Sequence, residues 1–162
     1  MENQSYEYRN WGELIADALV LIITKLTLRD KLHSIPIVCK PWYKVITSSP
    51  HCWLDIDFDE LFDDFHIQHI QVMSVRMRLL QLLPILLRRC SPKFHSFSCS
   101  KYLNASSLSL LANSGTESLR TLKMPWTDLS NDETIFESVA RKLSNLTYLD
   151  ISHCSGIGVE GL

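Results

Sequence analysis

The stretch from Trp11 to Trp53 decides how the first part of this chain folds. It has the sequence WGELIADALVLIITKLTLRDKLHSIPIVCKPWYKVITSSPHCW. Apolar residues recur with a helical period from Leu14 to Leu26, and they cover most of the circumference of the expected helix. A helix that is apolar almost all round has to be covered on two sides. Its own small bundle can cover one side, so a second domain or another chain must cover the other.

Capping residues and prolines predict where the helices of this stretch begin and end. Thr27 to Asp30 forms a capping box that starts a second helix. Pro36 ends or bends that helix, because proline lacks a backbone amide and disfavours a helical residue before it. A third helix starts near Cys39, with Pro41 in its first turn, where proline is tolerated. The inner face of this third helix is expected to hold Val38, Trp42, Val45 and Ile46.

The order of these features resembles the F-box. The resemblance rests on W-x-x-L, D-x-L-x-x-I, the capped second helix, V-C-K-x-W and the closing P-x-C-W, and it covers residues 9–58. The chain is similar, more narrowly, to plant F-box proteins with leucine-rich repeats, in which Ile-Pro-x-Val-Cys-Lys also recurs. One departure is Leu14-Ile15, because many F-boxes have Leu-Pro at this point.

The resemblance implies three short helices that dock on a Skp-family adaptor, which in turn holds a cullin scaffold and a RING subunit. It also implies which residues contact the adaptor or directly support those contacts. These residues are Leu14, Leu19, Ile22, Leu26, Leu32, Pro36, Val38, Cys39 and Trp42. The alternative, that some of them and especially Trp42 belong to the internal core, stays open. We expect Leu19→Asp to abolish adaptor binding, because burying an unpaired charge costs several kcal/mol.

Within residues 53–59, apolar and acidic side chains alternate strictly from Leu54 onward, which predicts a half-buried strand. Three aspartates at this spacing resemble the start of a calcium-binding loop. Glu60 stands where that loop needs glycine and His66 where it needs glutamate, so we favour a solvated strand edge instead. The residues expected to point outward are Asp55, Asp57 and Asp59, and those expected to point inward are Ile56 and Phe58.

Three later segments share the spacing L-x-x-L-x-L. They begin at Phe94, Leu119 and Leu146, which lie 25 and 27 positions apart. This is the period of leucine-rich repeats, in which each unit is a short strand and a helix. Cys154 occupies the position at which the repeat takes Asn or Cys, and we interpret it as a small buried residue. Helices are expected over residues 79–87, over residues 106–113, and after residues 131–133 with Ile135, Val139 and Leu143 inside.

These patterns together predict an α/β (α+β) fold, in which a three-helix F-box precedes a short leucine-rich-repeat solenoid of alternating strands and helices. The expected parts are a polar tail (1–9), the F-box (10–58), an acidic and polar linker (59–78) and the repeats (79–162). The sequence ends where a third repeat helix should start, so the repeat array is expected to be truncated.

The strands of such repeats line a concave face, and the residues between the leucines point outward. The resulting surface is polar and mixed in charge, which suits the binding of a protein or peptide. It contains no nucleophile, base and orienting group in the arrangement that catalysis needs. The candidate residues for binding a target protein are Ser98, Thr121, Lys123, Tyr148 and Asp150.

Composition excludes several other classes of protein. The net charge is −2 and the basic residues are scattered, which disfavours nucleic acid as a partner. No apolar run reaches the roughly 20 residues of a membrane span. The five cysteines are dispersed and odd in number, which is typical of a reducing compartment and predicts a nuclear or cytoplasmic protein. No cofactor or metal is expected, because Cys90, His95 and Cys99 lack a fourth zinc ligand.

Three functions compete on these observations. The first is a non-catalytic substrate-recognition subunit of an SCF-type (Skp-cullin-F-box) ubiquitin ligase, which holds a target for ubiquitination and proteasomal degradation. The second is a truncated competitor that binds the adaptor without delivering a target. The third, an enzyme such as a cysteine hydrolase, is disfavoured. The chain has no G-x-S-x-G motif, no glycine-rich phosphate loop and only five glycines.

Overall fold

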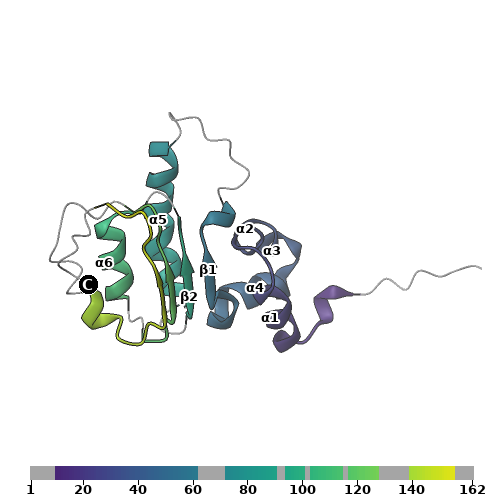
Figure 1. Cartoon of the computed structure of the whole chain (residues 1–162). Helices are drawn as coiled ribbons and strands as arrows, with labels where there is room; N and C mark the ends of the chain where they lie inside the picture. The colour runs from purple at the N-terminus through teal and green to yellow at the C-terminus, as the bar shows by residue number, and fades with distance from the viewer. Residues whose placement is uncertain are drawn as a thin grey trace, which may run out of the picture.

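The computed structural model describes residues 10–61, 72–90, 94–100, 103–114, 117–127 and 139–155. Short helices gather at the N-terminal end, and a small sheet backed by two further helices follows them (Figure 1). The predicted α/β class is confirmed, because the sheet is parallel and alternates with helices along the chain.

Four short α-helices, rather than the expected three, make up the N-terminal group. They are α1 (Ala16–Thr24), α2 (Leu28–His33), α3 (Ile35–Val38) and α4 (Lys40–Ser48), flanked by the 3-10 turns η1 (Trp11–Glu13) and η2 (Pro50–Trp53). The expected second helix is divided at Ser34, because Pro36 in the first turn of α3 has no amide with which to continue the ladder of α2. Pro41 lies in the first turn of α4, as predicted.

The predicted capping box is confirmed at the start of α2. The Thr27 hydroxyl accepts a hydrogen bond from the Asp30 amide at 3.1 Å and donates one to the Asp30 carboxylate at 3.0 Å. The Leu28 amide is satisfied from farther along the chain, because it donates to the Glu60 carboxylate at 2.6 Å. Glu60 lies in the turn η3 (Asp59–Leu61), so this bond ties α2 to the beginning of the sheet.

The inner face of α4 differs from the prediction at one position. Ile46 is buried, and Trp42 and Val45 pack partly against the core. Val38, however, is 50% exposed, and Ile35 occupies the core instead at 3% exposure. The extended backbone of Cys39 explains the difference, since it ends α3 before α4 begins and so leaves Val38 on α3 rather than on α4.

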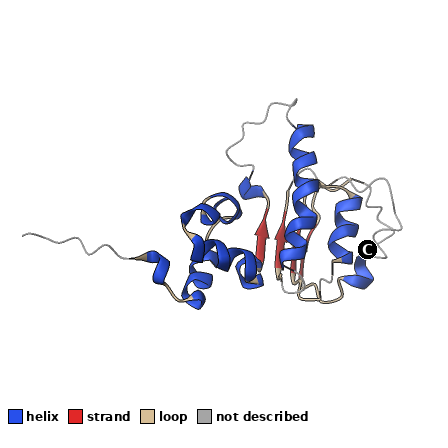
Figure 2. Cartoon of the chain, turned by 180° about the vertical axis from the view of Figure 1, so that it is seen from behind, coloured by secondary structure: helices blue, strands red, loops and turns tan. Residues whose placement is uncertain are grey.

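Four strands of three residues each form the parallel sheet: β1 (Asp55–Asp57), β2 (Ser96–Ser98), β3 (Thr121–Lys123) and β4 (Tyr148–Asp150). They lie in sequence order, and the N-terminal helices lie beside β1 (Figure 2). The central residues of the strands are aligned in one row across the sheet. This row is Ile56, Phe97, Leu122 and Leu149.

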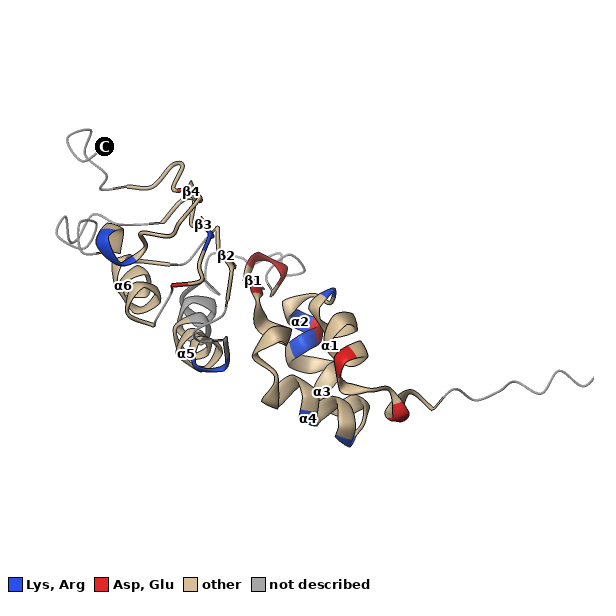
Figure 3. Ribbon diagram, turned by 90° about the horizontal axis from the view of Figure 1, so that it is seen from below, with Lys and Arg blue, Asp and Glu red and all other residues tan. Residues whose placement is uncertain are grey.

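Two helices, α5 (Val72–Cys90) and α6 (Ala105–Asn113), cover one side of the strands (Figure 3). The expected linker over residues 59–78 is therefore partly helical, because α5 already begins at Val72 and continues through Pro84. Asn104 caps α6 by accepting from the Ser107 amide at 3.0 Å. Residues 139–142 are also helical; Ile135 and residues 131–133 lie outside the described residues.

A single apolar core runs from the N-terminal helices into the sheet. It includes Ile23 and Ile46 from the helices, Trp53 from η2, Phe58 just after β1, and Phe97 from β2. The Trp53 indole donates to the Ile46 carbonyl at 2.9 Å, and the Arg89 guanidinium lies 5.5 Å from the Trp53 ring centroid. Trp53 therefore joins α4 to α5. Among the described helices, none is long and apolar enough to cross a bilayer.

Candidate protein-binding surfaces

The N-terminal helices leave large apolar side chains in contact with solvent. Ile22 and Val38, both predicted adaptor residues, are 37% and 50% exposed. Ile15 and Ile37 are more exposed, at 72% and 83%, and Leu21 is exposed at 68%. We call these five side chains of α1, its N-cap and α3 the apolar helix surface. Large apolar side chains left in solvent are candidates for a protein interaction site.

The sequence did not lead us to predict Ile15 or Ile37 as adaptor contacts. Ile15 departs from the proline of the family pattern, and it precedes the first turn of α1, where its side chain is left uncovered. Ile37 belongs to the segment Ile35–Val38, which contains no polar residue. A four-residue helix cannot bury all of its side chains, so the apolar composition of this segment was the available signal.

The other predicted adaptor residues are less accessible. Leu19 is 1% exposed and belongs to the core, so it supports the helices and offers no contact surface. Trp42 packs partly against the core, and its indole donates to the Trp11 carbonyl at 3.0 Å. The half-buried members of the predicted set are Leu14, Leu26, Leu32, Pro36, Cys39 and Trp42.

All five predicted target-binding residues lie on one face of the sheet. The register places Ser98 beside Lys123 and Lys123 beside Asp150, and it places Thr121 beside Tyr148. The Lys123 ammonium lies 5.7 Å from the Tyr148 ring centroid. We call this surface the strand face, defined by Asp55, Asp57, Ser96, Ser98, Thr121, Lys123, Tyr148 and Asp150.

Asp59 does not belong to a solvated strand edge, contrary to the prediction. Its carboxylate accepts hydrogen bonds from the Ser100 amide at 2.7 Å and from the Ser100 hydroxyl at 2.7 Å. The Ser98 hydroxyl is a third donor at 3.3 Å. These partners lie about forty positions along the chain, at and just after the end of β2, and only the parallel pairing of β1 with β2 brings them to Asp59.

Asp57 is also more buried than predicted, because it was expected to point outward into solvent. It is half-buried, and its carboxylate accepts from the Asp59 amide at 2.9 Å. Burial raises the pKa of Asp57, and the nearby carboxylates of Asp59 and Glu60 raise it further. Asp55 alone of the three aspartates is exposed. Figure 3 shows the acidic positions gathered at β1 and the turn after it.

Cys39, Cys52, Cys99 and Cys154 form no disulfide within the described part of the chain. Cys52 and Cys99 are buried. Cys154 is half-buried, its thiol lies 3.1 Å from the Met124 carbonyl, and burial raises its pKa. A raised pKa disfavours the nucleophilic thiolate. Within the described ranges, no three His, Cys, Asp or Glu side chains are grouped as a metal site requires.

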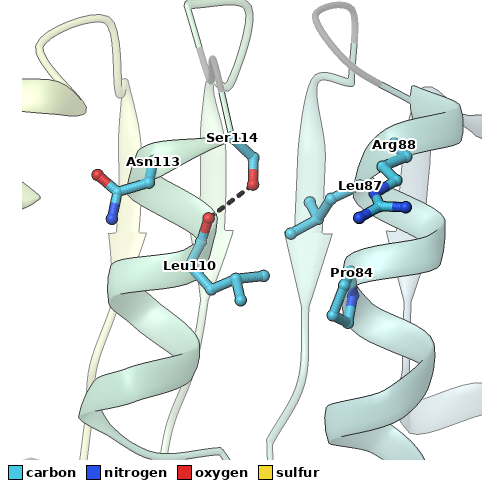
Figure 4. Close-up of a pocket in the computed structure, with 6 residues that line it drawn as sticks. All are labelled: Pro84, Leu87, Arg88, Leu110, Asn113 and Ser114. Carbon is cyan, nitrogen blue, oxygen red and sulfur yellow. Dashed lines mark hydrogen bonds between the residues drawn. The ribbon is translucent and has the colours of Figure 1, made fainter.

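An open groove separates α5 from α6 on the far side of the sheet (Figure 4). It is lined by Pro84, Leu87 and Arg88 of α5 and by Leu110, Asn113 and Ser114 at the end of α6. The Ser114 hydroxyl donates to the Leu110 carbonyl at 2.6 Å, so it closes the helix rather than facing a ligand. The groove contains one ionisable side chain among its lining residues and does not form a catalytic arrangement.

Comparison with known proteins agrees with the N-terminal pattern. No family model matches the chain. The chain is 37% identical over 157 residues to F-box protein FBW2 of Arabidopsis thaliana, an alignment that covers 96% of this chain. It spans 45% of the length of that relative. The predicted resemblance to a plant F-box protein is confirmed by this similarity.

Proposed function

We propose that this chain is a substrate-recognition subunit of an SCF-type ubiquitin ligase. Its N-terminal helices would dock on a Skp-family adaptor, and through the adaptor on a cullin and a RING subunit. The observation that carries the proposal is the apolar helix surface on a segment with the F-box pattern. Ile37 is 83% exposed and Val38 is 50% exposed, although the same helix places Ile35 in the core at 3%. An adaptor would remove these side chains from water.

The energy available from this surface supports a stable complex. Burying one exposed isoleucine or leucine side chain contributes about 1.5–3 kcal/mol. Several such side chains at the centre of an interface can dominate its affinity. Half-buried Trp42 and Leu32, which pack against the core, would hold the surface in place. We therefore propose Ile15, Ile22, Ile37 and Val38 as direct contacts and Leu19 as a support.

The strand face would hold the target protein. The four strands follow one another in order and in register, which supports the interpretation of residues 79–162 as leucine-rich repeats with β1 as a leading unit. Polar outward residues, with a central row that is buried in β1, β2 and β3, suit a protein-binding repeat surface. The role in ubiquitination would be proximity, because holding the target raises the effective concentration of its lysines at the ligase. We propose that this takes place in the nucleus or cytoplasm.

Co-expression with a plant Skp-family adaptor, followed by size exclusion, tests the docking proposal. We expect a stoichiometric complex. Ile37→Asp and Val38→Asp should each prevent it, because a carboxylate would be buried without a partner. Ile85→Asp is the matched control, since Ile85 is 49% exposed on α5, away from the apolar helix surface. A wild-type chain that stays monomeric beside the adaptor would overturn the proposal.

The competitor function remains the rival proposal, and it differs only in target delivery. The polar strand face favours target binding over simple competition. Reconstitution of the ligase with this chain and candidate targets would separate the two. Ubiquitin transfer that requires Lys123 and Asp150 supports the recognition subunit, whereas adaptor occupation without transfer to any target supports the competitor.

A further inference from the structure

Two aromatic side chains lie against each other beside the ends of β3 and β4. The Trp126 and His153 ring centroids are 4.2 Å apart, and the rings are nearly parallel at 13°. Trp126 is 64% exposed, so much of the indole remains in contact with solvent. Sequence analysis did not identify this pair, because the two residues are distant in the chain.

The backbone at both residues is unusual. Trp126 has φ 61° and His153 has φ 58°, and no other non-glycine residue within the described ranges has a positive φ. Each lies three positions after the last residue of its strand, Lys123 in β3 and Asp150 in β4. Since Lys123 and Asp150 are register partners, parallel pairing places the two turns side by side. The Trp126 amide donates to the Ser152 carbonyl at 2.9 Å and ties the turns together.

A left-handed conformation is unfavourable for a bulky side chain, whereas glycine adopts it freely. Strain of this kind is found disproportionately at ligand-binding sites, where the surrounding structure maintains it. The stack on His153 offsets part of the strain. Folding alone therefore gives little reason for a tryptophan at position 126, and an exposed tryptophan is among the strongest anchors of protein interfaces.

The charges around the pair indicate what kind of group would bind. Asp150 precedes the turn, and hydrogen bonds from Ser152 lower its pKa, with smaller contributions from Lys123 and His153. The strand face carries three carboxylates, Asp55, Asp57 and Asp150, against the single ammonium of Lys123. A positively charged side chain can bind the face of an indole while a neighbouring carboxylate accepts its hydrogen bonds. Phosphate groups would be repelled by the same carboxylates.

We propose that Trp126, stacked on His153 and flanked by Asp150, binds an arginine-bearing segment of the target protein. Guanidinium is the best match, because it is planar, stacks on aromatic rings and pairs with a carboxylate through two nitrogens. The proposal rests on the proposed function and names the chemistry of the partner. It also extends the predicted target surface from the strands to the turns that follow them.

A synthetic peptide of glycine, serine and arginine, labelled with fluorescein, tests this proposal by fluorescence anisotropy on the full chain. Its counterpart carries citrulline in place of each arginine, which keeps the shape and removes the charge. We expect the arginine peptide to bind roughly tenfold tighter than the citrulline peptide. We also expect its affinity to fall as salt rises. Equal binding of the two peptides by the unaltered chain would overturn the proposal without reference to any variant.

Trp126→Gly locates the binding. Glycine suits the φ of this position, so we expect a melting temperature close to that of the unaltered chain and roughly tenfold weaker binding of the arginine peptide. Trp126→Phe should retain most of the affinity, and Asp150→Asn should weaken it. Trp11→Gly is the matched control, because Trp11 is 54% exposed in the N-terminal helices. Unchanged affinity in Trp126→Gly would contradict the assignment.

Adaptor binding of the same variants is measured in parallel by size exclusion, so that the two proposals can fail separately. Trp126→Gly should still form the adaptor complex. If the chain binds the arginine peptide but does not bind the adaptor, the ligase proposal is contradicted and the arginine-site proposal is supported. If the chain forms the adaptor complex but binds both peptides equally, the arginine-site proposal is contradicted and the adaptor-docking proposal is supported.

Discussion

The N-terminal helices and the strand face expose opposite kinds of side chain to solvent. The helices present isoleucine, leucine and valine to solvent, with Ile37 exposed at 83%. The strand face presents Ser98, Thr121, Lys123 and Asp150, while the central residues Phe97 and Leu122 are buried. An apolar surface favours a permanent partner, because leaving it in water is unfavourable at all times. A polar surface is stable when it is exposed to water, and it suits a partner that binds transiently.

The largest effect expected from this contrast concerns two leucines of α1. Leu19 is 1% exposed and Leu21 is 68% exposed. Leu19→Asp should lower the free energy of unfolding by about 4 kcal/mol or more, because the carboxylate is buried in the core without a partner. Leu21→Asp, two positions away, should change it by less than about 0.5 kcal/mol.

Chemical denaturation of the two variants measures this difference. Similar stability of Leu19→Asp and Leu21→Asp would contradict the assignment of Leu19 to the core and Leu21 to the surface. If Leu19→Asp is much less stable than Leu21→Asp, the loss of adaptor binding predicted for Leu19→Asp from the sequence follows from unfolding. Loss of adaptor binding in Ile37→Asp would instead follow from the loss of a direct contact.

A second comparison lies within the sheet. Phe97 is fully buried and its ring centroid lies 5.6 Å from that of Phe58, whereas its counterpart Leu149 in β4 is 50% exposed. Phe97→Ala should cost about 3–5 kcal/mol through lost burial and an internal cavity. Leu149→Ala should cost less than about 1 kcal/mol, since much of its surface is already in water. Equal losses in denaturant titrations would indicate that β4 is covered as fully as β2.

The aspartates of β1 and the turn η3 after it provide a third comparison. Asp59→Ala removes the acceptor of the Ser98 and Ser100 hydrogen bonds and should cost about 2 kcal/mol. Asp55→Ala, at an exposed position of β1, should cost less than about 0.5 kcal/mol. Amide exchange at Ser100 should accelerate in Asp59→Ala alone, and unchanged exchange there would argue against the role of Asp59.

The smallest effect expected is a pH dependence from Asp57. Burial raises its folded pKa above the ordinary value of 3.8, so the folded state holds the proton more tightly than the unfolded state. This carboxyl therefore favours folding at low pH, and that contribution is lost as pH rises from the ordinary value through the raised pKa. Asp57→Asn should flatten this part of the stability curve and retain an acceptor for the Asp59 amide. If the stability of the unaltered chain and that of Asp57→Asn change with pH in the same way, the role of Asp57 in the pH dependence is contradicted.

Much of the local structure could be predicted because its causes lie close together in the sequence. Thr27 and Asp30 are three positions apart, and their hydrogen bonds form as predicted. The spacing of Phe94, Phe97 and Cys99 placed all three side chains inward, and all three are buried. The α6 helix ends at Asn113 as expected, with Leu108 and Leu111 inside.

The errors concern contacts between distant residues. Asp59 was expected in solvent because its donors, Ser98 and Ser100, are remote in the chain. Val38 was expected on the inner face of α4, but the extended backbone of Cys39 leaves it on the separate helix α3. The proposed adaptor and target contacts stay predictions, because a side chain's exposure indicates availability and does not identify the partner.

The sequence by itself determined the start of α2, the end of α6 and the places of the strands, since capping and alternating hydrophobicity act over a few residues. The tertiary structure alone decided that Leu19 is buried while Ile22 is exposed, and that Trp126 stacks on His153. These outcomes depend on packing between elements that are distant along the chain. A helix that is apolar all round does not specify which side meets its own core, and only the assembled fold makes that choice.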